Sequence, residues 1–214
     1  IIPMALVNGC IGIATGWSSN IPCYNPLDLT DAIREWLKNT PSKPLTAVKD
    51  GEDDEYTSPD SPFKKFTPWY RGFNGKIEPN SNGKFVTTGV INRIKGKKNQ
   101  LEVTELPIGL PTNKFKDMLE DLLQSKYIKG VRNYSTPKTV SFHINEDDQG
   151  LLCNEKNLKL TSSLYTSNMV LFDENEQIKR FNPVDQIVDT FCRVRLGFYE
   201  KRKKYQVDCI QKEI

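Results

Sequence analysis

Apolar residues recur every three or four positions in three parts of the chain, which predicts three amphipathic helices. The first should begin at the Asn-Pro pair 25–26, an N-cap followed by proline, and end by Pro41. The second should be capped by Thr112 or Asn113, and the third should run from the Asn-Pro pair 182–183 to the chain end. The apolar positions are Leu29, Ile33, Trp36, Leu37, Phe115, Met118, Leu119, Leu122, Leu123, Val184, Ile187, Val188, Phe191, Val194 and Phe198.

Other parts of the chain have the composition of strands. Runs rich in β-branched residues at 85–94 and 101–106 flank a lysine-rich turn, which predicts a hairpin with a basic tip. Residues 140–144 alternate between apolar and polar, and 169–173 form a short apolar run, so each predicts a further strand. The basic tip could contact phosphate, although such a turn is usually a solvated surface feature. Its cations are Arg93, Lys95, Lys97 and Lys98.

The opening run, residues 1–22, is apolar but follows neither a helical nor a two-residue period. Pro3 breaks it early and three glycines follow, so we expect a strand that leads into a shaped loop. Ile13 stands among these glycines and has two interpretations. It is either a core side chain of a tightly packed strand and turn, or a large apolar side chain on a surface without bulky neighbours. The glycines do not match a GxGxxG phosphate loop.

Composition adds limits to this picture. The 214 residues are 37% hydrophobic and 27% charged with a net charge of +3, which fits one or two globular units. No signal peptide or membrane-spanning segment is expected, and the start at Ile1 suggests an excerpt of a longer protein. Five cysteines without metal-ligand spacing indicate reduced thiols of an intracellular protein. Residues 40–68, with five prolines and an acidic run at 52–55, predict a flexible surface loop; adjacent carboxylates alone define no metal geometry.

Catalytic chemistry is not evident in the sequence. The only histidine, His143, is expected on the outer face of a strand without an orienting partner. None of the eight tyrosines has a neighbouring base, and no carboxylate cluster suits paired metals. The run from Lys159 to Asn168 is rich in hydroxyls, which suits either contact with backbone phosphates or an ordinary loop.

Four ordered blocks of the chain resemble eukaryotic-type DNA topoisomerase II. They are PMALVNG with GIATGWSSNIP at 3–22, PWYRGFNGKI at 68–77, KLTSSLYTSNMVLFD at 159–173 and VDQIVDTFCRVRLGFYEKRK at 184–203. The chain departs from the family wording at Cys10, at Ala14 and at Ile11, where the family has a glutamate. It also has Gly109 and Pro111 near the place where the family has an arginine and a tryptophan that meet DNA.

The resemblance implies an α+β fold with a tower-type mixed sheet and flanking helices. Residues 1–24 would be the end of a winged-helix region with a DNA-wedge loop. Residues 25–181 would form the tower domain, with 40–68 as a flexible insert, and 182–214 would begin a coiled-coil arm. The parent protein would be a homodimeric nuclear enzyme, without a membrane segment, that passes one DNA duplex through another in an ATP-driven reaction.

In this family the isoleucine that matches Ile13 is the wedge that bends the gated duplex. The resemblance further implies contacts to double-stranded DNA from 159–168, and Arg71 lies in the second matching block. The catalytic tyrosine would lie outside this chain, and Mg²⁺ and ATP would bind outside it. The chain alone should therefore be inactive. A stand-alone DNA-bending module and a protein-interaction domain remain alternatives. The expected DNA-binding residues are Ile13, Arg71, Lys159, Leu160, Thr161, Ser162, Ser163, Leu164, Tyr165, Thr166, Ser167 and Asn168.

Overall fold

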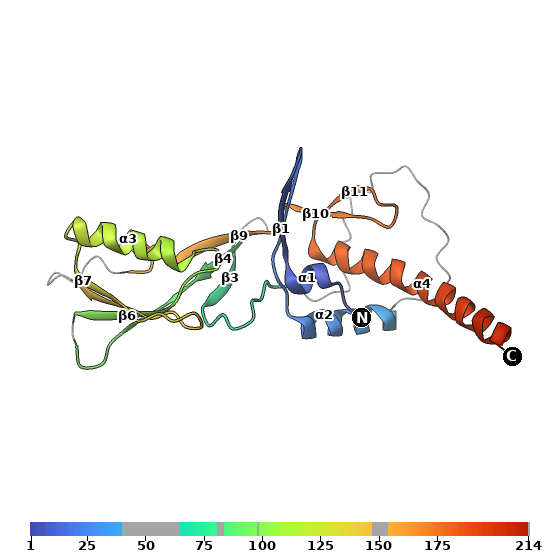
Figure 1. The fold of residues 1–214 in the computed structure, drawn as a ribbon, viewed down its shortest axis with the longest axis horizontal. Coiled ribbons are helices and arrows are strands. Elements are labelled where there is room, and N and C mark those ends of the chain that lie inside the picture. The colour runs from blue at the N-terminus through green and yellow to red at the C-terminus, as the bar shows by residue number, and fades with distance from the viewer. Residues whose placement is uncertain (40–64, 81–83, 98, 147–153, 214) are drawn as a thin grey trace. The chain divides into compact units, whose positions relative to one another are not determined.

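The computed structural model describes residues 1–39, 65–80, 84–97, 99–146 and 154–213. Most of the predicted insert at 40–68, with its acidic run, lies outside these residues. Within them the chain is α+β, which confirms the predicted class (Figure 1). The predicted mixed sheet is wrong for the described residues, because every strand pair there is antiparallel. The tower and winged-helix assignments stay predictions.

The chain divides into two compact units. Unit 1 comprises Ile1–Pro68 and Thr166–Ile214, and unit 2 comprises Trp69–Tyr165. These limits do not coincide with the predicted boundaries at 24/25 and 181/182, because the helix after residue 25 and the strands after residue 168 share one core with the C-terminal helix.

The described residues of unit 1 form two strand pairs and three helices. Strand β1 pairs with β2, and β10 pairs with β11. The elements are α1 (Met4–Asn8), β1 (Cys10–Ala14), β2 (Trp17–Ile21), α2 (Pro26–Asn39), β10 (Met169–Phe172), β11 (Ile178–Phe181) and α4 (Val184–Glu213). Helices α2 and α4 pack together, and the indole N–H of Trp36 donates a 2.8 Å hydrogen bond to Asp189. The core includes Leu6, Ile21, Tyr24, Leu29, Trp36, Met169, Phe181, Ile187 and Val188.

The prediction that the chain opens with a strand is wrong for its first residues. Residues 4–8 form α1 instead, with Leu6 fully buried, and the strand begins only at Cys10. Helix α2 follows the prediction more closely, because the Asn25 side chain accepts a 3.0 Å hydrogen bond from the Leu27 amide. Leu37, however, is exposed rather than part of the buried face.

Helix α4 has two different halves. Its N-terminal turns bury Val184, Ile187 and Val188, whereas apolar side chains from Phe198 onward are exposed. The helix begins at Val184, and the Gln186 side chain accepts a 3.1 Å hydrogen bond from the Asn182 amide. The predicted long helix is therefore confirmed. Asn25 accepts a capping hydrogen bond with its side chain, but among the hydrogen bonds of the described residues the Asn182 side chain accepts none of this kind.

In the part of unit 2 that the structure describes there are two sheets and one helix. The three-stranded sheet has the order β3-β4-β9, and the four-stranded sheet has the order β5-β6-β8-β7. The elements are β3 (Lys76–Asn80), β4 (Lys84–Thr88), β5 (Val90–Arg93), β6 (Gln100–Glu105), α3 (Thr112–Gln124), β7 (Ile128–Asn133), β8 (Phe142–Glu146) and β9 (Thr161–Tyr165). The core joins α3 to the larger sheet through Leu101, Val103, Phe115, Leu119, Phe142 and Ile144.

The predicted strand at 85–94 is in fact two strands in different sheets. Gly89 separates β4 from β5, and a Cβ at this position would overlap the Glu105 carbonyl oxygen. The Gly89 amide donates a 2.9 Å hydrogen bond to the Leu160 carbonyl. The hairpin of β5 and β6 is confirmed, but the first half of the run belongs to the smaller sheet.

Two further predictions in unit 2 need correction. Helix α3 starts after Pro111 without a side-chain cap, so neither Thr112 nor Asn113 caps it. Strand β7 was not predicted, although it pairs with β8. Val140 lies before β8, which begins at Phe142.

Candidate functional site

The opening of the chain forms a protruding two-stranded hairpin. In the antiparallel register of β1 and β2, Ile13 lies opposite Ser18 and Ala14 opposite Trp17. The turn between them includes Gly16, whose φ of 78° is one that glycine adopts without a steric cost. Ile11 and Ile13 share one face because successive strand side chains alternate.

The side chain of Ile13 is 93% exposed and that of Ile11 is 84% exposed. A large apolar side chain displayed to this degree makes no contribution to the core of the described residues. The interpretation of Ile13 as a core residue is therefore wrong. A Cβ placed at Gly12, between the two isoleucines but on the opposite face of β1, would also meet nothing within 4 Å, so that face is uncrowded.

The base of the hairpin is held to unit 1 by buried side chains and polar contacts. Ile21, at the end of β2, is 1% exposed. The Asn20 amide donates to the Asn168 carbonyl at 2.8 Å, and the Val170 amide donates to the Ser19 hydroxyl at 3.1 Å. These bonds tie β2 to the start of β10, so the exposed isoleucines project from a fixed base.

Gly9 fixes the entry of the hairpin. Its φ is 68°, and an added Cβ would lie 2.8 Å from the Ile21 carbonyl oxygen and 2.9 Å from the Cys23 sulfur. The Cys23 thiol donates to the Asn8 carbonyl at 3.2 Å, and burial raises the pKa of this thiol. Only glycine allows the backbone to approach this closely.

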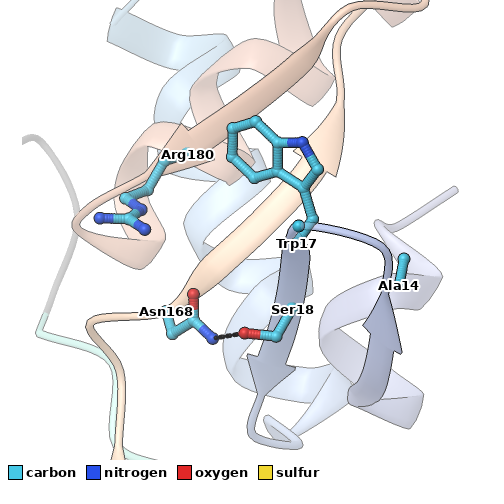
Figure 2. Close-up of a pocket in the computed structure, with 6 residues that line it drawn as sticks. Ala14, Trp17, Ser18, Asn168 and Arg180 are labelled. Carbon is cyan, nitrogen blue, oxygen red and sulfur yellow. Dashed lines mark hydrogen bonds between the residues drawn. The ribbon is translucent and has the colours of Figure 1, made fainter.

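A pocket of about 370 Å³ opens beside the hairpin (Figure 2). The Asn168 side-chain amide donates a 2.9 Å hydrogen bond to the Ser18 hydroxyl, and the Trp17 indole and the Arg180 side chain lie close by. The lining residues are Ala14, Gly16, Trp17, Ser18, Asn168 and Arg180. Of these only Asn168 was expected from the sequence to bind DNA.

The hydroxyl-rich run is mainly a strand rather than a loop. In unit 2, β9 pairs with β4 at one edge of the three-stranded sheet. Thr161, Ser163 and Tyr165 are exposed, whereas Ser162 and Leu164 are half-buried on the other face. The Leu160 side chain is fully buried in the core of unit 2, so it offers no surface to a ligand.

The pairing of β4 with β9 adds residues that the sequence did not indicate. Lys84 lies opposite Tyr165, with its ammonium 5.2 Å from the ring centroid. Lys76 lies opposite Thr88, which in turn lies opposite Thr161, so both lysines belong to the same sheet face. By the same register this face also carries the exposed carboxylate of Glu78, which lies opposite Val86. We call this surface the hydroxyl face; it consists of Lys76, Glu78, Asn80, Lys84, Val86, Thr88, Thr161, Ser163 and Tyr165.

The remaining predicted residues are mostly at the surface. Arg71 is exposed in the turn that the Phe73 amide closes onto the Tyr70 carbonyl at 3.2 Å. Lys159 is exposed with a φ of 49°, just before β9. In unit 1, Ser167 is exposed and Thr166 is half-buried.

Arg93 and His143, both noted in the sequence, each have a carboxylate partner in unit 2. Arg93, one of the cations near the basic turn, forms a 3.0 Å ion pair with Glu146, whose side chain is 2% exposed. Lys98 lies outside the described residues. His143 does have a partner, because its Nε2 is 3.5 Å from the Glu102 carboxylate and its ring is 4.7 Å from that of Tyr134.

The described residues include no cluster of three or more His, Cys, Asp or Glu side chains that could hold a metal ion. Cys10, Cys23, Cys192 and Cys209 are free thiols. Burial, with a smaller effect of Asp189, raises the pKa of Cys192 to about 12. In the part of the chain that the structure describes, no helix is both long and apolar enough to span a bilayer.

Comparison with known proteins identifies similar sequences along the whole chain. The family model for the A-type subunits of DNA gyrase/topoisomerase IV matches residues 1–214. The DNA topoisomerase 2 of Invertebrate iridescent virus 6 is 34% identical over 216 residues, which are 100% of this chain and 17% of that protein. The DNA topoisomerase 2 of Plasmodium falciparum is 36% identical over 224 residues, which are 100% of this chain and 14% of that protein.

A solved structure is similar over nearly all of the chain. The crystal structure of the Plasmodium falciparum topoisomerase II DNA-binding, cleavage and re-ligation domain has a TM-score of 0.83 and 36% identity. The match covers 99% of this chain and 27% of that one. The chain thus spans 17% or less of the length of the two curated relatives described above.

Proposed function

The chain belongs to the DNA gyrase/topoisomerase IV family, and from this membership we propose that it is the part of a type II DNA topoisomerase that binds and bends a DNA duplex. The whole protein would pass one duplex through a transient break in the other. A stand-alone DNA-bending module is the alternative.

The observation that carries this proposal is the display of Ile13. Its side chain is 93% exposed near the end of a hairpin whose base is fixed by Ile21 and the Ser19 contact. Exposing an isoleucine to water gains nothing for the fold, since burying it would stabilise the chain by about 1.5–3 kcal/mol. A wedge between base pairs would remove this apolar surface from water.

Bending by a wedge has a definite energy balance. Unstacking a base step costs a few kcal/mol, which the additional contacts of the bent duplex with the protein must offset. A side chain on an anchored hairpin enters the stack with little loss of its own freedom, because the backbone of β1 is already paired with β2.

The contacts that offset this cost would be to backbone phosphates. Lysines and hydroxyls are common donors to phosphate oxygens and carry no sequence information. In unit 2 the hydroxyl face offers such donors, and Arg71 and Lys159 are exposed cations. Affinity should therefore fall steeply with salt and vary little with sequence. Leu160 is left out of this set because it is buried.

The test uses Ile13→Ala in the complete protein that contains this chain. End-to-end distance in a bound, dye-labelled duplex reports the bend, and the melting temperature reports the fold. We expect straighter DNA with an unchanged melting temperature. A variant that bends DNA like the wild type would overturn the proposed role. Residual bending should depend more on sequence, because pyrimidine–purine steps are easier to open.

Catalysis is expected to need other parts of the complete protein. From the family membership we propose that Mg²⁺, ATP and the nucleophilic tyrosine belong to other regions of the complete protein. The 214-residue chain alone should therefore not relax supercoiled DNA. Relaxation by the complete protein, with ATP, would separate an enzyme from the stand-alone module.

Assembly and location also belong to the proposal. We propose a homodimer, which equilibrium sedimentation of the complete protein would test. We also propose a nuclear location. Similar proteins include one named as mitochondrial, from Dictyostelium discoideum, and one from a virus, so fluorescence imaging of the complete protein in its own cells is the relevant measurement.

A further inference from the structure

The pocket beside the hairpin is lined by polar and cationic side chains, and Ile13 is not one of them. Its lining comes from four strands of unit 1 or the residues next to them: the tip of the β1–β2 hairpin, Asn168 just before β10, and Arg180 on β11. Arg180 is exposed and, among the described residues, no carboxylate lies within ion-pair distance of its guanidinium. A cation that contributes no ion pair to the fold is free to meet a ligand.

Groups that can donate hydrogen bonds line the same pocket. The Ser18 hydroxyl oxygen accepts the hydrogen bond from the Asn168 amide at 2.9 Å, so its own proton can be donated elsewhere. Arg180 adds five N–H donors in a planar fork. No aspartate or glutamate lines the pocket. This set of groups suits an anion with several oxygens.

We propose that this pocket binds one phosphate of the DNA backbone, next to the base step that Ile13 opens. The inference rests on the proposed function and extends it to residues that the family resemblance did not indicate. Arg180 would bind two phosphate oxygens through its fork, and Ser18 would donate to one of them.

The register of the hairpin places this phosphate next to the wedge. Ser18 lies directly opposite Ile13, and residues opposite one another in antiparallel strands have Cβ atoms about 5 Å apart. A phosphate bound by Ser18 would therefore belong to a nucleotide close to the opened step. Trp17 is 46% exposed and offers an apolar wall for the adjoining deoxyribose. Holding the backbone at this point would resist slippage of the duplex while the stack is open.

The test measures duplex affinity of the complete protein as a function of salt concentration. Arg180→Gln should lower the slope of log K against log salt by about 0.9 and weaken binding about tenfold at low salt. Lys179→Gln is the matched control: it removes the same charge from the neighbouring position of β11, whose side chain points to the opposite face. It should leave the slope unchanged. Arg180→Lys should retain the slope, since its ammonium still neutralises the phosphate.

A second measurement needs no variant and covers the case in which Arg180→Gln does not fold. Single methylphosphonate linkages are placed along the duplex, each of which removes one phosphate charge. Wild-type protein should lose about one unit of salt slope at a single position beside the bend. Where the variant folds, it should show no further loss at that position.

Several results would overturn the pocket proposal. Equal slopes for wild type and Arg180→Gln would do so, as would equal losses for the two Gln variants, which would indicate diffuse charge. Saturable binding of inorganic phosphate that requires Arg180, with no change in duplex affinity, would show a site for free anions. If wild type bends DNA and Ile13→Ala does not, these results reject only the pocket. If wild type neither binds nor bends DNA, the proposed function fails first.

Discussion

The hairpin of β1 and β2 and the hairpin of β5 and β6 share an antiparallel pairing but have opposite surfaces. Each is antiparallel, and each has a glycine with positive φ in its turn, Gly16 at 78° and Gly96 at 84°. In the first, Ile11 and Ile13 are exposed. In the second, the alternate residues Leu101 and Val103 are 3% and 0% exposed.

The difference comes from what covers each strand. Strand β6 lies between β5 and β8, and its apolar face joins a core with Phe115 and Leu119 of α3. Strand β1 pairs only with β2 in its sheet, and neither of its isoleucines belongs to a core cluster of the described residues. The same alternation of apolar side chains thus stabilises the fold in one hairpin and is available for binding in the other.

The largest expected effect is on stability. Leu101→Ala should lower the free energy of unfolding of unit 2 by about 2–5 kcal/mol, because it removes buried methyl groups and leaves a cavity. Ile13→Ala should change stability by less than about 0.5 kcal/mol, as is usual for exposed positions. Urea unfolding of the two variants measures both. Comparable losses would mean that the first hairpin also supports a core.

Glycine substitutions give the next largest effect. Gly9→Ala should destabilise unit 1 by about 1–3 kcal/mol, since it forces a side chain into positive φ. The new Cβ would also lie 2.8 Å from the Ile21 carbonyl oxygen. Gly12→Ala is the control in the same hairpin, where a Cβ meets nothing within 4 Å. Thermal unfolding should show a clear drop only for Gly9→Ala, and a tolerated alanine at Gly9 would contradict the observed entry geometry.

Sequence patterns identified the helices well because their signals are local. Helix α2 has apolar spacing and the Asn25 cap within one segment, and the spacing of α3 is clear even though its start carries no side-chain cap. Helix α1 was missed because five residues are too few to show a helical period. Strand β7 was missed because its residues alternate weakly and its place depends on pairing with β8.

The candidate site was less predictable because distant segments build it. The resemblance indicated Ile13, but only the structure shows that its side chain is displayed. Lys84 joins the hydroxyl face through pairing with Tyr165, and Arg180 reaches the pocket through β11. Leu160 was predicted to bind DNA together with its polar neighbours, but its side chain is fully buried just before strand β9. No local pattern contains these pairings.

A smaller effect is expected from Ile11→Glu, which places a carboxylate on the same exposed face of the hairpin as Ile13. The side chain is 84% exposed, so stability should stay within about 0.5 kcal/mol of wild type. A carboxylate near phosphates should weaken duplex affinity of the complete protein about fivefold, equivalent to roughly 1 kcal/mol of repulsion in water. Ile11→Gln is the uncharged control. The bend should persist, and its loss would mean that Ile11 shares the wedge role with Ile13.

The smallest effect is expected at the basic turn of the second hairpin. Lys95→Gln with Lys97→Gln removes two exposed cations, and Arg93 is already paired with Glu146 at 3.0 Å. Exposed lysines without a phosphate partner release no bound counterions, so the salt slope of duplex binding should change by less than about 0.5. Lys84→Gln, on the hydroxyl face of the same unit, should lower the slope by about 0.9. If the double variant instead lowered the slope by about 1.8 and Lys84→Gln did not, the second hairpin would also contact DNA. The second hairpin would then stabilise the core through Leu101 and Val103 and bind DNA through its basic turn. The contrast between the two hairpins would in that case hold only for their apolar side chains.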